Sequence, residues 1–344
     1  MGDARLRARR GFRQSTLTLA DVAKEAGVSE ITVSRVIRAR GSVAEETRRR
    51  VQTAISKIGY VPNRIAGSLA SAGSDLIGVI IPSLGNIVFP DVLRGLHDAI
   101  SERGFRAVVS VTDYRLESER ELVRSLLSWR PAALIVTGCE HEPDTRQMLV
   151  NAGLTIVEVM DADGEAIDIA IGMSHARAGR ETAAFLLARG YRRFGYIGHD
   201  LARDLRACKR RETFTSTVRE AGASFAGEVV TPGRSSVPSG RSALAELLTA
   251  HGDIDAVYFS NDDMAIGGVF HCMAEGIAIP DKLAIVGFNG LAMGQALPQP
   301  LTTILTPRFD IGFRAGLAVI ARFDGLEVPR LTDVGFTLLP GATA

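Results

Sequence analysis

The chain has 344 residues, 46% of them apolar and 23% charged, which is typical of a soluble globular protein with two or three domains. No apolar signal core follows the basic first residues, and no uncharged apolar run reaches the ~18 residues of a membrane span. The cysteines Cys139, Cys208 and Cys272 form no CxxC pair, which favours buried, reduced thiols. We therefore expect a cytoplasmic protein without contact to a membrane.

Charge is unevenly distributed along the chain. Residues 1–64 carry 14 Lys and Arg against 6 Asp and Glu, a balance of +8, whereas the whole chain carries +1 and the remainder therefore −7. A basic segment on an acidic body favours a polyanionic partner. A solubilising tail is the alternative, and the arginines within residues 5–13 could serve as one. We expect residues 1–17 to form a basic flexible arm.

Residues 18–60 are predicted to form three helices. In TLADVAKEAGVSEITVSRVI, Gly27 is placed to adopt the positive φ of a turn, and the Ser29 hydroxyl can cap the helix that follows. The apolar spacing on both sides of this turn indicates a helix-turn-helix, whose second helix enters the major groove of DNA. An apolar face over roughly 44–58 can complete the core. An ordinary helical hairpin is the alternative, but it does not account for the basic charge.

Residues 61–75 are predicted to form a hinge helix and a linker. The segment PNRIAGSLA (62–70) has helical apolar spacing but only about two turns, and isolated helices shorter than ~12–15 residues are marginal in water. Gly67 costs this helix about 1 kcal/mol relative to alanine. We therefore expect a helix that needs a partner to be stable.

Residues 76–340 alternate between short apolar runs and amphipathic stretches, which indicates parallel sheets covered on both faces. About ten such units are too many for one core, so we expect two doubly wound α/β subdomains. The strands are expected at 76–81, 106–111, 132–137, 155–159, 194–198, 255–260 and 282–288. The helices are expected at 90–103, 117–129, 144–152, 174–189, 207–221, 238–251 and 261–276. A long helix at 307–325 and a last strand at 334–339 could return the chain to one or both sheets.

The segments LADVAKEAGVSEITVSRVI, GYVPNRIAGSLA and LIGVIIP resemble the LacI family of bacterial transcriptional repressors, and the resemblance covers about residues 18–340. It implies a DNA-binding head, a hinge helix and a core similar to periplasmic sugar-binding proteins. Such repressors bind double-stranded, near-palindromic operators as homodimers. The chain ends in FTLLPGATA without a heptad tail, so we expect a dimer rather than a tail-built tetramer.

The resemblance places Glu30, Ile31 and Arg35 of the recognition helix against base edges. Glu can accept from cytosine N4, Arg can bind guanine, and Ile can contact a thymine methyl. Phosphate contacts are implied for Thr32 and Ser34. The family often has Ser or Thr at position 44, where this chain has alanine, so residue 42 (a serine) could take over the capping of the third helix.

In the hinge, the resemblance places Leu69 at the family's wedge position, where an apolar side chain parts a base step in the minor groove. Asn63, Arg64 and Ala66 are expected along the same groove. The full set of expected DNA contacts is Thr18, Ser29, Glu30, Ile31, Thr32, Ser34, Arg35, Asn63, Arg64, Ala66 and Leu69.

The carboxyl ends of the strands in both subdomains are expected to face a cleft that binds a small effector. The resemblance implies that Phe89, in the loop after the first strand, forms an apolar wall and that Arg210 supplies a cation. Two alternatives stay open: Asn261 could simply cap a helix, and Arg210 could lie on a solvated face. The full set of expected effector contacts is Ser83, Asn86, Phe89, Thr137, Asp161, Arg210, Asn261 and Asn289.

The strand end VGFNG distinguishes ligand classes. Sugar-binding members often carry Asp where this chain has Asn289 and Gly290, and the loss of a carboxylate near Arg210 favours an anionic ligand. PSLGNIVFPDVLRG and GQALPQPLTTILTP resemble the branch that represses gluconate-utilisation genes. We therefore expect gluconate or a related sugar acid as inducer; a ketogluconate, an idonate or 6-phosphogluconate would satisfy the same argument.

Other functions compete with this interpretation. G-x-G-x-x-G, Gly-Lys, G-x-S-x-G and HExxH are all absent, which argues against an enzyme and leaves no cofactor or metal to expect. A transporter's solute-binding protein could share the body but not the helix-turn-helix. A regulator with a neutral sugar inducer, or with a corepressor, remains an alternative.

Overall fold

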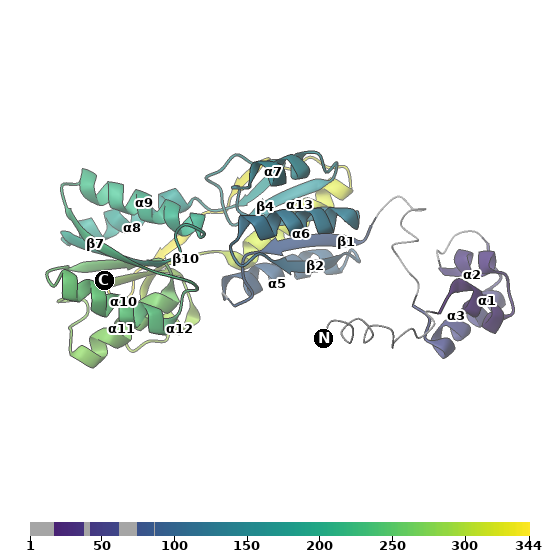
Figure 1. The fold of residues 1–344 in the computed structure, drawn as a ribbon, viewed down its shortest axis with the longest axis horizontal. Coiled ribbons are helices and arrows are strands. Elements are labelled where there is room, and N and C mark those ends of the chain that lie inside the picture. Colours follow the sequence, from purple (N-terminus) through teal and green to yellow (C-terminus); the bar gives the residue numbers. More distant parts are fainter. Residues whose placement is uncertain (1–16, 38–41, 62–73, 86) are drawn as a thin grey trace, which may run out of the picture. The chain divides into compact units, whose positions relative to one another are not determined.

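The computed structural model describes residues 17–37, 42–61, 74–85 and 87–344 (Figure 1). The chain divides into two units, Met1–Gly73 and Ser74–Ala344. Almost all of the expected basic arm and most of the hinge lie outside the described residues. The same holds for five expected contacts, namely Asn63, Arg64, Ala66, Leu69 and Asn86.

The head consists of three helices, α1 (Leu19–Ala26), α2 (Glu30–Ile37) and α3 (Glu45–Ile58). Gly27 ends α1 with a φ of 63°, and the Ser29 hydroxyl accepts a hydrogen bond from the Thr32 N–H at 3.3 Å, so both turn predictions are confirmed. Arg50 of α3 donates to the Ala26 carbonyl at 2.6 Å and thereby ties α3 to the end of α1. The buried side chains between the helices are Val22, Ala23, Ala26, Val33, Val36, Val51 and Ala54.

Helix α3 begins without the side-chain cap that Ser42 was expected to be able to supply. Ala44 precedes the helix and offers no side-chain acceptor, and Ser42 makes no capping hydrogen bond. Two acidic residues in the first turn, Glu45 and Glu46, instead place negative charge at the positive end of the helix.

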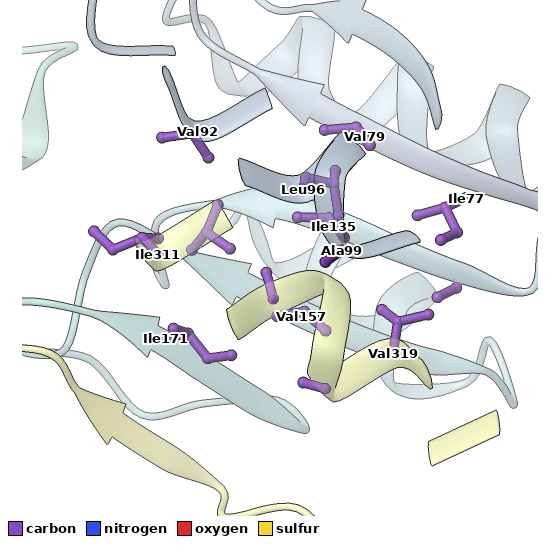
Figure 2. Packing of buried hydrophobic residues seen from close by; sticks show 14 of the residues in the cluster. Ile77, Val79, Val92, Leu96, Ala99, Ile135, Val157, Ile171, Ile311 and Val319 are labelled. Carbon is purple, nitrogen blue, oxygen red and sulfur yellow. The ribbon is translucent and has the colours of Figure 1, made fainter. Parts of the chain in front are cut away.

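The first lobe of the core contains a six-stranded sheet in the order β11-β5-β4-β3-β1-β2, with all pairs parallel. Helices α5 and α13 pack on one face of the sheet and α6 and α7 on the other. Figure 2 shows Leu96 of α5 and Val319 of α13 in the same cluster of buried side chains as Val157 of the sheet. The elements are β1 (Leu76–Ile81), α5 (Val88–Ser101), β2 (Arg106–Val111), α6 (Leu116–Ser128), β3 (Ala133–Thr137), α7 (Pro143–Val150), β4 (Thr155–Val159), β5 (Ile169–Gly172), α13 (Arg308–Phe323) and β11 (Leu331–Asp333).

The second lobe repeats this plan with the order β12-β10-β9-β8-β6-β7, in which only the β10–β12 pair is antiparallel. Helices α10 and α11 pack on one face and α8 and α9 on the other. The elements are α8 (His175–Ala188), β6 (Arg193–His199), α9 (Leu205–Glu220), β7 (Ser224–Thr231), α10 (Val237–Ala250), β8 (Ala256–Phe259), α11 (Asp262–Glu275), β9 (Ala284–Asn289), α12 (Ala292–Gln295), β10 (Thr302–Leu305) and β12 (Thr337–Leu339).

The chain crosses between the lobes three times, after β5, after β10 and after β11. Segments near the carboxyl end, drawn in yellow in Figure 1, therefore occur in both lobes. The long helix expected at 307–325 returns the chain to the first sheet and the last strand returns it to the second. The expected fold class, a helical head and two doubly wound subdomains, is confirmed.

Four strands were not expected from the sequence: β5, β7, β10 and β11. β7 is an edge strand with half-exposed side chains, and β10 begins with two threonines, so neither forms a continuous apolar run. Helix α5 begins at Val88 rather than at residue 90, because a proline at position 90 is tolerated in the first turn, where the N–H groups have no helical partner.

Two expectations concern the whole chain. Among the described residues, no helix combines the length and the apolar character needed to cross a bilayer. Cys139, Cys208 and Cys272 are free thiols; Cys139 and Cys272 are buried, as expected, but Cys208 is only half-buried. Burial raises the pKa of Cys139 and of Cys272.

Candidate functional site

A cavity of about 570 Å³ lies between the two lobes, at the carboxyl ends of their strands. This volume is in the usual range for a small-molecule site. We call it the main cavity. Its lining from the first lobe is Ser83, Gly85, Ile87, Asp113 and Tyr114. Its lining from the second lobe is His199, Asp200, Arg203, Asp204, Gly233, Arg234, Ser235, Val237, Asn261, Asp263, Ile266, Asn289, Leu291, Ala292 and Met293.

One wall of the main cavity is a chain of hydrogen bonds with a defined direction. The Gly233 carbonyl can only accept, so Nδ1 of His199, 3.1 Å away, carries the proton. Nε2 of the neutral ring then accepts from the Asn261 amide at 2.9 Å, and the Asn261 oxygen accepts from the Asn289 amide at 3.1 Å. The chain ends at Asn289 Oδ1, so this uncharged wall presents an acceptor and spare N–H groups.

The two asparagines are held rigidly at the carboxyl ends of β8 and β9. Asn261 precedes α11, but its side chain bonds within the wall and caps no N–H, so the capping alternative is wrong for its side chain. Buried Asp262 accepts from the Leu291 N–H at 2.6 Å and from the Thr303 hydroxyl at 2.6 Å, which fastens the loop after Asn289. Burial raises the pKa of Asp262 to about 6.

Backbone strain is concentrated at this cavity. Four lining residues other than glycine have positive φ: Asp113 at 52°, Tyr114 at 59°, Asp200 at 33° and Asn289 at 116°. Such conformations cost energy and persist where the surrounding structure enforces them, commonly at functional sites. The strained residues and the hydrogen-bonded wall therefore both identify the main cavity as the functional site.

The main cavity carries charges of both signs. Asp113 pairs with Arg234 at 2.7 Å across the cleft, and Asp200 pairs with Arg203 at 3.3 Å. Asp204 accepts from the first turn of α9. Most of the carboxylates around the cavity are thus already engaged, and a ligand meets mixed polar groups rather than a simple anion hole.

Arg210 is placed differently from the expectation. It is 3% exposed, so the solvated-face alternative is wrong, but it does not line the main cavity. Its guanidinium lies 3.7 Å from the centre of the Phe288 ring and donates to the Ser260 carbonyl at 3.1 Å and to Nδ1 of His175 at 2.9 Å. Gly179 permits this packing, because a Cβ there would lie 2.2 Å from the Arg210 carbonyl oxygen. Arg210 supports the wall from behind.

Three more expected effector contacts lie away from the main cavity. Phe89 belongs to α5 and is 2% exposed in the core, so it forms no wall of the cleft loop; the helix simply begins earlier than expected. Thr137 ends β3, donates to the Ile80 carbonyl at 3.0 Å and lines a smaller cavity beside the main one. Buried Asp161 binds Nζ of Lys209 at 2.7 Å, an ion pair that joins the two lobes. Ser83, Asn261 and Asn289 do line the main cavity.

A buried charged group lies below the loop after β3. Nδ1 of His141 is 3.1 Å from both oxygens of Glu119, and Nε2 is 3.3 Å from Glu158. Burial disfavours the imidazolium, but the hydrogen bonds to the two carboxylates outweigh it and raise the pKa of His141 to about 9. The histidine is therefore charged at neutral pH and holds the loop that carries Glu140, a second partner of Lys209.

The sequence interpretation missed several lining residues, above all His199, Arg203 and Arg234. His199 directly follows the strand expected at 194–198, and a lone histidine in a loop is more often a hydrogen-bonding residue than a catalyst. Nothing in the local pattern separated Arg203 from its neighbouring arginines. Among the described residues, no cluster of His, Cys, Asp or Glu suits a metal ion.

On the head, α2 presents an exposed stripe opposite its buried face. Ile31 is 67% exposed, with Glu30 and Arg35 exposed beside it and Thr32 and Ser34 half-buried. A large exposed apolar side chain between charged groups suits contact with a base edge. The expected contact Thr18 caps α1, where its N–H donates to Asp21 at 2.8 Å.

Comparison with known proteins matches both units. A family model described as "Bacterial regulatory proteins, lacI family" covers residues 18–63, and "Periplasmic binding proteins and sugar binding domain of LacI family" covers 74–333. The HTH-type transcriptional regulator GntR of Pseudomonas aeruginosa is 38% identical over 94% of both chains. GntR of Escherichia coli K12 is 36% identical over 94% of this chain and 98% of its own. The crystal structure of a LacI family transcriptional regulator from Silicibacter pomeroyi superposes with a TM-score of 0.91 at 41% identity, covering 95% of this chain and 99% of the other.

A helix-turn-helix head joined to a two-lobed core with a cavity between the lobes defines a DNA-binding transcription regulator. The chain belongs to the LacI family, which is not a family of enzymes.

Proposed function

We propose that this regulator is a repressor of sugar-acid catabolism genes. It binds a near-palindromic operator as a homodimer and is released when gluconate, or a closely related sugar acid, occupies the main cavity. The observation that carries the proposal is the uncharged wall of His199, Asn261 and Asn289 in a cavity of sugar size.

The wall suits the hydroxyl groups of a sugar acid. Asn289 Oδ1 can accept from a hydroxyl, and each asparagine amide has a second N–H to donate. Because the wall carries no formal charge, it does not repel a carboxylate elsewhere on the ligand. The GntR names of two relatives, and the gluconate-repressor resemblance of the loops, support the same class of ligand.

A route from the wall to the first lobe exists within the core. Arg308 donates to the Asn289 carbonyl and, through Nε at 3.0 Å, to Asp91 of α5. A ligand that draws Asn289 toward itself therefore acts on a helix of the opposite lobe. If occupied and empty cores differ in lobe spacing, the ligand shifts the population of a hinge helix that starts near zero stability.

The test compares gluconate with sorbitol, its neutral counterpart, by thermal shift and by operator gel shift. A ligand at 100 times its Kd adds about 2.7 kcal/mol to the stability of the protein that it binds. We expect gluconate to stabilise the chain and to release the operator. Stabilisation by sorbitol alone would identify a neutral inducer, and tighter operator binding with ligand would identify a corepressor; either result contradicts the proposal.

Substitution N289D tests whether the uncharged wall of His199, Asn261 and Asn289 binds the effector. It keeps the shape of the side chain and restores the acid that neutral-sugar relatives often have, so gluconate affinity should fall about 10-fold through like-charge repulsion. Asn151→Asp, at an exposed position after α7, is the matched control. Equal gluconate affinity of N289D and the parent would remove the wall from the binding site.

A further inference from the structure

The main cavity adjoins a second, smaller cavity of about 40 Å³, and Tyr114 and Arg203 line both. A space of this size holds one small group and not a sugar. We infer that the second cavity is an anion subsite, which takes the terminal oxyanion of the effector, carboxylate or phosphate, while its hydroxyls face the wall of the main cavity. This inference rests on the proposed function and names the group that supplies its charge recognition.

Arg206 is the residue that makes the subsite cationic. It lies one turn before Arg210 on α9, and its side chain is only 12% exposed. Its guanidinium makes no hydrogen bond to any described residue, and its one ion pair, with Asp204, is long at 3.9 Å. Arginine carries five N–H donors in a planar fork that matches an oxyanion. A poorly paired, largely buried guanidinium at a cavity is therefore suited to receive one.

Two further arginines contribute charge. Arg115 lines the second cavity, and its guanidinium donates, among the described residues, only to the Ser118 hydroxyl, at 3.1 and 2.9 Å, so it is not neutralised by any described carboxylate. Arg203 pairs with Asp200 at 3.3 Å in an exposed position, where ion pairs are weak. Both can turn toward a bound anion.

The two carboxylates that line the second cavity are already balanced. Glu119 faces the charged ring of His141 at 3.1 Å, and Glu140 is paired with Nζ of Lys209. Neither carboxylate therefore needs Arg206 as its partner. Apart from its long ion pair with Asp204, the arginine is thus left for an anion that enters from the main cavity.

The subsite is shared by the two lobes. Arg206 comes from the second lobe, and its Nη1 would lie 3.4 Å from a Cβ placed on Gly138 of the first lobe. Gly138 has a φ of 87°, which favours glycine, and it leaves space beside the guanidinium. An anion bound here contacts both lobes at once, so charge recognition and lobe closure occur together.

The experiment measures the affinity of gluconate, 6-phosphogluconate and sorbitol by calorimetry in the parent chain, R206Q and R206K. Arg219→Gln, exposed at the end of the same helix, is the matched control. R206Q should weaken both acids by about 10- to 100-fold, as expected for a lost charged hydrogen bond, and leave sorbitol nearly unchanged. R206K should lie between, because lysine keeps the charge but not the fork. A larger loss for 6-phosphogluconate than for gluconate assigns the subsite to phosphate, and the reverse assigns it to carboxylate.

Two results would overturn the subsite: unchanged acid affinity in R206Q, or equal losses for acids and sorbitol, which would make Arg206 a purely structural residue. Inorganic phosphate, tested alone by thermal shift, separates this inference from the proposed function. If the parent binds no sugar acid but phosphate stabilises it and not R206Q, the proposed function fails and the subsite stands. If neither phosphate nor acids distinguish the parent from R206Q, the subsite fails.

Discussion

Nδ1 of His175 accepts a hydrogen bond from Arg210 at 2.9 Å, while Nε2 of the same ring donates to the Met160 carbonyl of the opposite lobe at 2.8 Å. The ring must therefore be neutral. Burial, and then the charge of Arg210, keep the pKa of His175 well below its usual value. Arg210 thus stabilises a contact between the lobes from a position behind the wall of His199, Asn261 and Asn289.

Substitution of Arg210 by methionine should consequently act on stability. It removes the donors of the Ser260 carbonyl and of His175, and we expect the free energy of unfolding to fall by about 2 kcal/mol. Urea unfolding of R210M measures the loss, with Arg219→Met as the control. A variant of parental stability that had lost only effector binding would show that Arg210 reaches the ligand.

The charge of His141 should make stability depend on alkaline pH. Its pKa is raised from an unfolded value of about 6.5 to about 9. The contribution of the charged ring to the free energy of unfolding is therefore complete below pH 6.5 and is lost as pH rises through 9. We expect H141Q to cost about 3 kcal/mol at pH 6 and much less at pH 9.5. Urea unfolding at both pH values measures this. His97→Gln, on the exposed side of α5, should show no such dependence, and a pH-independent deficit in H141Q would contradict a charged ring.

Because Ile31 is exposed, its substitution should lower operator affinity without lowering the stability of the head. I31A should change the free energy of unfolding by less than about 0.5 kcal/mol, because the side chain is 67% exposed. Operator affinity should fall about 10-fold through a lost base contact. V33A, from the buried face of the same helix, should instead lose about 2 kcal/mol of stability. Undiminished operator binding by I31A would place the reading face of α2 elsewhere.

Gly67 should weaken the hinge helix, although this segment lies outside the described residues. Gly67→Ala favours the helix by about 1 kcal/mol in each protomer, so the operator should bind more tightly and induction should need more effector. Gel-shift titrations with and without gluconate measure both effects. Unchanged affinity, together with an equally helical hinge on DNA by circular dichroism, would mean that the glycine serves another purpose, such as close approach of two hinges.

Local sequence patterns were sufficient to predict the fold class and most of the helices and strands. The Gly27 turn, the Ser29 cap and the apolar runs of β1, β2 and β4 depend on neighbours in the chain, and the structure reproduces them within the expected bounds. Edge strands such as β7 were missed, because their half-exposed side chains leave no apolar run to detect.

The composition of the cleft could not be predicted in the same way, because it depends on contacts between distant segments of the chain. Asn261 and Asn289 could be identified from strand ends, but their bond to each other and to His199 joins three loops. Arg210 and Arg206 lie one helical turn apart within the same run of arginines, and nothing nearby in sequence tells them apart. Helix α8 approaches closely at Gly179 and buries Arg210 behind the wall. The loop at Gly138, in the opposite lobe, leaves Arg206 beside a cavity. Long-range packing thus determines which arginine is available to a ligand, because burial and partners depend on the whole fold and not on local spacing.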